Sequence, residues 1–226
     1  MLRLRDHQTG QFRDIPPYAL HIHVHGGGER ALIIADLLRR LAERSRRRVV
    51  LTRAEHVRPH VDFAELSLPD VEPIAPDRVT EGAVWVGPDA VTGRRCLVVP
   101  PQRYSWAKLV DSTSVDATCV RLAFLREHYS EPDEVDGDLV VGAGSDLAHW
   151  RNSMAEWATE PGRPMDRAYA SRAEESLAND LDSPGALAVL DELTADPRVA
   201  PGAKLETVIH LDLILGLDLV SGIGRA

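Results

Sequence analysis

The most constraining stretch of this sequence is an alternating apolar segment that ends in three glycines and leads into an amphipathic helix. Residues 19–24 read ALHIHV, and this strict alternation predicts a strand. Gly26–Gly28 follow, and from Glu29 the apolar residues recur at helical spacing. Residues 46–52, RRRVVLT, supply a second strand. Strand, helix and strand in this order predict a β-α-β unit of a parallel sheet with a right-handed crossover.

The rest of the chain changes character about halfway. Residues 57–82 are rich in Pro, Asp and Glu and predict a loop, while 84–87 and 95–100 predict two more strands, paired as a hairpin around GPDAVTG. We therefore expect an α/β domain over residues 1–112 and an α-helical bundle over residues 113–226. Helical periodicity recurs in five later stretches, Val115–Tyr129, Gly144–Ala158, Met165–Asp180, Pro184–Leu193 and Lys204–Leu215.

Residues typical of helix caps mark two helix ends in the second half. Asp182 stands just before Ser183 and Pro184, an arrangement typical of a capped helix start. Gly216 is a plausible helix stop, since glycine readily adopts the left-handed conformation found at helix ends.

Composition limits the classes of partner. The net charge is −9 and the isoelectric point about 5.5, so the chain has no overall attraction for nucleic acid and tRNA is not expected as a partner. No apolar run reaches the roughly 18 residues of a membrane span, and the first residues lack the apolar region of a signal peptide. We expect a cytoplasmic protein in which the two cysteines, Cys96 and Cys119, are reduced and buried.

The alternating segment places three histidines on one face of the predicted strand. His21 and His23 could hold zinc with a third ligand from elsewhere. His21 and His25, four residues apart, lie roughly 13 Å from each other on a regular strand, so all three cannot bind one ion. The alternative is a row of polar histidines on a partly open sheet face.

The three glycines point to a different chemistry. They follow the first strand of the predicted sheet and precede a helix, which is where open α/β sheets bind ligands and where a helix N-terminus favours an anion. Glycines let a phosphate approach the backbone closely. The spacing is neither the Walker pattern nor GxGxxG, and a plain turn remains an equal alternative.

Four segments resemble the cysteinyl-tRNA synthetases, class I synthetases with a nucleotide-binding α/β domain. HGGGERALIIADLLRRL (25–41) is similar to that family's HIGNARTFVVFDVLRRYL, with matches at His25, Gly27, Arg30, Asp36, Leu38, Arg39 and Arg40. LRLRDHQTGQ (2–11) resembles the family's opening segment. VDATCVRLAFLREHYSEP (115–132) and LANDLDSPGALAVLDEL (177–193) resemble two later ones, with His128, Tyr129 and Pro132 in register. KLETVIHLDLILGLDL (204–219) looks most like the end of the mycothiol-pathway cysteine ligase, a relative that joins cysteine to an amino sugar without tRNA.

The departures from that family are as informative. The zinc ligands of the family have no counterpart here, so no zinc is expected, and residues 57–82 stand in place of its large insertion. Where the family has its lysine-rich KMSKS loop, this chain has PQRYSWAK (101–108), in which Ser105 could align and Arg103 or Lys108 could offer a cation. The resemblance thus implies a reduced class I synthetase-type, Rossmann-like parallel sheet followed by a helical bundle. It also implies an ATP or adenylate site at His25, Gly26, Gly27, Gly28, Arg30 and Ser105.

Two hypotheses for function follow. The first is a degenerate ligase that binds ATP or an aminoacyl adenylate and joins an amino acid to a small acceptor. The second is a non-catalytic paralogue that acts as an accessory subunit or a ligand sensor. No GxSxG or HExxH motif is present, and no catalytic residue is assigned. The carboxylate pairs Glu174–Glu175 and Asp180–Asp182 are expected to be solvated, and Glu29 places a carboxylate near the predicted phosphate site.

Overall fold

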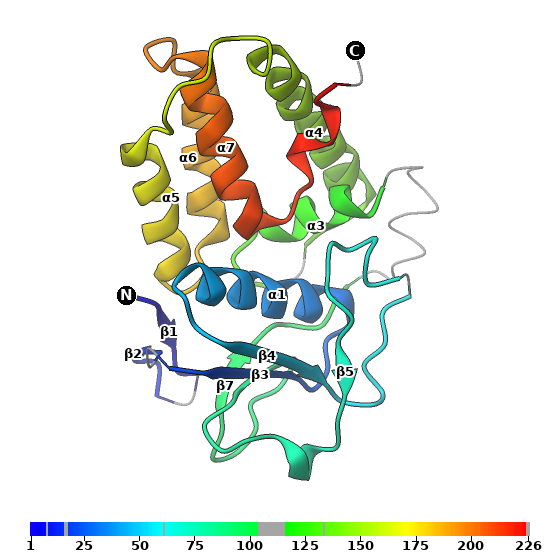
Figure 1. Cartoon of the computed structure of the whole chain (residues 1–226). Helices are drawn as coiled ribbons and strands as arrows, with labels where there is room; N and C mark the ends of the chain where they lie inside the picture. The colour runs from blue at the N-terminus through cyan, green and yellow to red at the C-terminus, as the bar shows by residue number, and fades with distance from the viewer. Residues whose placement is uncertain (8, 16–17, 61, 104–115, 133, 225–226) are drawn as a thin grey trace.

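The computed structural model describes residues 1–7, 9–15, 18–60, 62–103, 116–132 and 134–224. Its centre is a five-stranded parallel sheet with the order β5-β4-β3-β6-β7 (Figure 1). The strands are β3 (Leu20–Val24), β4 (Val49–Arg53), β5 (Glu72–Pro73), β6 (Val84–Gly87) and β7 (Arg95–Val98). Between β3 and β4 runs helix α1 (Gly28–Arg44), so the predicted β-α-β unit and the α/β class are confirmed.

The predicted hairpin between β6 and β7 is wrong. The two strands pair in parallel, with Val84 opposite Arg95 and Gly87 opposite Val98. Each strand has only four residues, a length of about 13 Å. The connection 88–94 is therefore long enough to return the chain to the starting edge of the sheet, although parallel connections usually need a dozen or more residues. Short strands and a turn-rich connection did not reveal the direction of pairing.

The segment 57–82 is largely irregular, as predicted, but it contributes the short edge strand β5 and a 3-10 turn, η1 (Pro76–Arg78). An N-terminal antiparallel hairpin, β1 (Arg3–Arg5) with β2 (Phe12–Asp14), was not predicted. This hairpin continues onto the helical half, because Arg3 forms a parallel bridge with Asn179.

Five helices and a final 3-10 turn lie in the described part of the second half. They are α3 (Ala117–Leu125), α4 (Gly137–Trp157), α5 (Arg167–Ala178), α6 (Ser183–Ala195), α7 (Pro201–Leu215) and η2 (Leu219–Gly222). Each α-helix covers a stretch predicted to be helical, whereas η2 was not predicted. Helix α4 begins at Gly137 rather than Gly144, because the Asp136 side chain accepts from the Leu139 N–H. The predicted caps are confirmed: Asp182 accepts from the Gly185 N–H at 2.9 Å, and Gly216 ends α7 with φ of 68°. The proposed domain boundary at 112/113 lies outside the described residues.

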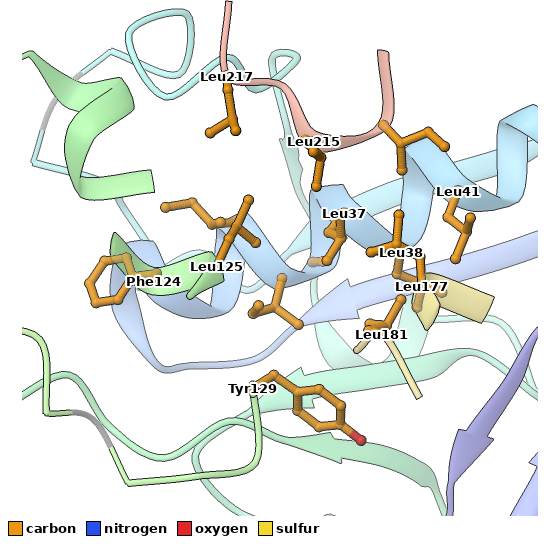
Figure 2. Close-up of a cluster of buried hydrophobic side chains, with 14 of the residues drawn as sticks. Leu37, Leu38, Leu41, Phe124, Leu125, Tyr129, Leu177, Leu181, Leu215 and Leu217 are labelled. Atoms are coloured by element: carbon orange, nitrogen blue, oxygen red, sulfur yellow. The ribbon is translucent and has the colours of Figure 1, made fainter. Parts of the chain in front are cut away.

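Helix α1 lies between the sheet and the later helices (Figure 1). It is consequently buried on more than one side, and residues 29–38 are all buried. Figure 2 shows Leu37, Leu38 and Leu41 of this helix among apolar side chains of the second half. One hydrophobic core therefore runs from the sheet through α1 into the helices. Both cysteines are buried and unpaired, and no helix in the described ranges is long and apolar enough to cross a membrane.

Candidate functional site

The candidate ligand site lies at the carboxyl edge of the sheet, where β3 ends. The His25 N–H donates to the carbonyl of Val86 on the neighbouring strand, which holds the end of β3 beside β6. Gly27 and Gly28 then adopt positive φ values of 91° and 64°, conformations that favour glycine. Gly27 is the N-cap of α1 and provides no side-chain cap. The first N–H groups of the helix therefore lack the usual side-chain acceptor, which suits an incoming anion.

The glycines also allow parts of the chain to approach each other. A Cβ on Gly26 would lie 2.9 Å from the Pro88 ring, and one on Gly27 would lie 2.8 Å from the Ala31 Cβ. A Cβ on Gly28 would lie 3.1 Å from the Gln102 side-chain oxygen. A tight turn packed on Pro88 thus accounts for Gly26, whereas Gly28 faces a polar side chain that a ligand could contact.

A hydrogen bond fixes the orientation of the His25 imidazole and the ring nitrogen that carries its proton. Its Nε2 lies 3.1 Å from the Asp89 carbonyl, and because a carbonyl only accepts, Nε2 carries the proton. The Nδ1 atom is left as an acceptor, and it is buried with no hydrogen-bond partner among the described residues. A Cβ on Gly87 would lie 2.5–2.8 Å from this ring. Gly87 is therefore needed for the position of His25, a role that sequence reasoning missed although its place at a strand end before Pro88 was a signal.

Glu29 lies in the first turn of α1, and its carboxylate is bound by His60. Its side chain is only 2% exposed, and Oε1 accepts from the His60 backbone N–H at 2.7 Å and from His60 Nδ1 at 2.6 Å. The segment 57–82 is thereby attached to the start of α1. Sequence reasoning expected this carboxylate near the phosphate site but did not identify His60 as its partner.

Arg30 is engaged by other parts of the protein. It is fully buried, and its guanidinium lies within hydrogen-bond distance of the backbone carbonyls of Pro100, His128 and Glu131. Its position joins the end of the sheet half to the segment after α3. The remaining predicted site residue, Ser105, lies outside the described residues.

The histidine row of β3 forms a hydrogen-bonded network. The Thr80 N–H donates to His21 Nδ1, so His21 Nε2 donates to the Thr52 hydroxyl at 2.8 Å. His23 Nδ1 lies 3.0 Å from the same hydroxyl, and its ring meets Trp85 edge-on with centroids 4.6 Å apart. Burial, together with the neighbouring His21 and His25, lowers the pKa of His23 to about 4, so this ring is neutral at pH 7.

No group of three or more His, Cys, Asp or Glu side chains in the described part of the chain could hold a metal ion. His21 and His23 both bind Thr52, and their rings belong to the face of the sheet that also carries Trp85. The three histidines lie along one sheet face, where His23 is buried and His21 and His25 are half-buried.

The motif residues Asp36, Arg39 and Arg40 have structural roles. Asp36 is fully buried and accepts hydrogen bonds from Arg39, Arg40 and Arg121. Burial alone would raise the pKa of Asp36, but the three guanidiniums outweigh it and lower that pKa, so Asp36 is ionised. Arg121 was not identified from the sequence, because its position in a helix carries no local sign of this contact.

One carboxylate prediction is wrong. Asp180 was expected to be solvated but is 6% exposed, because its Oδ1 accepts from the Tyr129 hydroxyl at 2.8 Å and from the Arg5 N–H at 2.7 Å. His128 Nε2 also donates to the Asp180 carbonyl. Two of the segments that resemble the synthetase family, 115–132 and 177–193, thus meet at Asp180.

The parallel sheet and the glycine turn that opens on α1 fit the α/β fold implied by the resemblance. No protein-family model matches the chain. The chain is similar to proteins described as L-cysteine:1D-myo-inositol 2-amino-2-deoxy-alpha-D-glucopyranoside ligase. The one from Thermobispora bispora is 37% identical over 107 residues, 46% of this chain and 25% of the relative. The one from Salinispora arenicola is 36% identical over 112 residues, 46% of this chain and 26% of the relative.

The predicted resemblance to class I cysteinyl-tRNA synthetase-like cysteine ligases is confirmed by these matches. A third such ligase, from Actinosynnema mirum, is 37% identical over 112 residues, which again cover 26% of its length. The matched part of this chain therefore spans about a quarter of each curated relative, and the protein is cysteine-ligase-like over that part.

Proposed function

We propose that the protein is a cysteine-ligase-like protein that binds ATP or an aminoacyl adenylate at the N-terminus of α1. The observation that carries this proposal is the turn at Gly27 and Gly28, where positive φ values and the lack of a side-chain cap present backbone N–H groups at the carboxyl edge of a parallel sheet.

Chemistry beyond binding needs positive charge at the developing pyrophosphate. Arg30 is engaged with backbone carbonyls inside the protein, and Arg103 pairs with Glu134 at 2.6 Å. Ligation of an amino acid to a small acceptor would therefore be slow, and the proposed primary activity is the binding of a small molecule. No zinc, tRNA or membrane partner is part of the proposal.

The second candidate is a non-catalytic paralogue that serves as an accessory subunit or a ligand sensor. It is favoured by Glu29, whose buried carboxylate stands in the first turn of α1 and opposes phosphate there. In that case the protein binds a partner protein, or a ligand without phosphates.

Calorimetric titration distinguishes the two candidates. With ATP and with a non-hydrolysable cysteinyl-adenylate analogue, we expect heat at millimolar ligand, which corresponds to about 4 kcal/mol. Gly27→Val should abolish it, because the side chain would clash with Ala31 and disfavour the positive φ. Gly82→Val is the matched control, since Gly82 also has positive φ and a Cβ there meets no atom within 4 Å. No heat with either ligand would reject the nucleotide proposal in favour of the accessory role.

A further inference from the structure

A cavity of about 450 Å³ lies at the far end of α1, between the last turn of that helix and α5. Its walls include Arg44 and Arg47 on one side and Glu174 and Glu175 on the other. Residues 28 and 44 are the ends of α1 and stand about 24 Å apart along its axis. The cavity is therefore separate from the proposed nucleotide site, and its volume falls at the small end of ligand pockets.

Arg47 lines this cavity and forms no ion pair with any of the described residues. Its Nη1 atom is shielded from solvent and has no hydrogen-bond partner among the described residues. Burial also lowers the pKa of Arg47. Arg47 as a residue is half-buried and belongs to the cavity lining, so the part of its guanidinium that is not shielded is available to an acceptor in the cavity.

The opposite wall is acidic, and hydrogen bonds orient one of its two carboxylates. Arg44 donates to His210 Nδ1 at 2.8 Å, and because Arg is only a donor, His210 Nε2 carries the proton and donates to Glu174 Oε1 at 2.7 Å. Glu174 is thus oriented through α7. No ion pair joins Arg47 to Glu174 or Glu175 within the described ranges, so the two signs of charge face the same space without neutralising each other.

These charges select the kind of ligand. A phosphate or other polyanion would meet two carboxylates, and a simple cation would meet two guanidiniums. A molecule with a carboxylate at one end and an ammonium at the other can pair with both walls. We propose that this cavity is a binding site for a free α-amino acid, with its carboxylate on Arg47 and its ammonium on the Glu174 and Glu175 wall.

The test begins with a panel of L-cysteine, L-leucine, L-glutamate and L-arginine at 10 mM in a thermal-shift assay, since a specific ligand stabilises by mass action. Calorimetry then compares the best of the four with its des-amino and decarboxylated analogues. We expect at least one amino acid to bind, and each analogue to bind at least tenfold more weakly. No binding by any of the four, or equal binding of either analogue, would overturn the proposal.

Variants locate the site. Arg47→Gln should weaken binding at least tenfold, while Arg48→Gln, the same change at an exposed neighbouring residue, should leave it unchanged. Glu174→Gln should weaken binding of the amino acid but not binding of its des-amino analogue. Gly27→Val should keep amino-acid binding, so that failure of the nucleotide proposal and failure of this one are distinguishable. Binding that is indifferent to Arg47→Gln would refute the assigned site.

Discussion

Asp36 and Arg121 form an ion pair of 2.8 Å with both side chains fully buried. The pair joins α1 to α3, two helices that lie far apart in the sequence. Arg121 also donates to the carbonyls of Leu215 at the end of α7 and of Leu66 in the segment 57–82. One guanidinium therefore connects the helix that covers the sheet, two helices of the second half and the irregular segment.

Removing the charge of Asp36 is expected to destabilise the protein strongly. Asp36→Asn leaves the buried Arg121 without its counter-charge, and breaking a buried pair in this way typically costs about 3–5 kcal/mol. Urea unfolding measures the loss. Glu43→Gln removes another carboxylate from α1, but one whose pair with Arg39 is partly exposed, so it should cost less than about 1 kcal/mol. Equal costs for the two variants would contradict the assigned role of Asp36.

The stability of the protein should rise with pH between about 4 and 6.5. The pKa of His23 is about 4 in the folded protein and near 6.5 in an unfolded chain, so the unfolded state binds more protons in this window. The contribution of His23 to the free energy of unfolding is fully present above about pH 6.5. It is lost as the solution is acidified, by up to about 3 kcal/mol.

Urea unfolding at several pH values tests the histidine effect. His23→Asn should flatten the dependence on pH, because asparagine keeps a polar atom near Thr52 and does not titrate. His7→Asn, the same change at an exposed histidine, should leave the slope as it is. An unchanged slope in His23→Asn would show that other groups cause the acid sensitivity.

Gly87→Ala is expected to displace the His25 ring. The new Cβ would lie 2.5–2.8 Å from three ring atoms, and forcing a group into a packed site typically costs about 1–3 kcal/mol. The measurements are unfolding stability and the NMR signals of His25. Gly142→Ala is the matched control: its Cβ meets nothing within 4 Å, and alanine in a helix should stabilise slightly. Undisturbed His25 signals in Gly87→Ala would refute the contact.

Glu29→Gln is expected to strengthen ATP binding about two- to fivefold if the nucleotide lies over the start of α1. The substitution removes a negative charge from the first turn, and the amide oxygen can still accept from His60. Calorimetry gives the affinity. Glu43→Gln, near the opposite end of α1, should have no effect. Weaker binding in Glu29→Gln would place the phosphates elsewhere.

Local patterns predicted the elements better than their pairing. The alternation in 19–24, the helical spacing after Glu29 and the caps at Asp182 and Gly216 identified strand, helix and helix ends correctly, because each depends on neighbours within a few residues. The parallel direction of β6 and β7 was missed. Two four-residue strands carry no local sign of their relative direction, which depends on how the connection 88–94 packs.

For the candidate site, the sequence determined the glycine turn, its place after the first strand of the sheet and the similarity to cysteine ligases. Only the tertiary structure decided where the charged side chains point. Arg30 contacts backbone carbonyls inside the protein, Glu29 binds His60, and Arg47 lines a cavity without an ion pair to any described residue. The physical reason is that a side chain's partner is set by contacts between segments distant in sequence, and periodicity and spacing describe only the chain nearby.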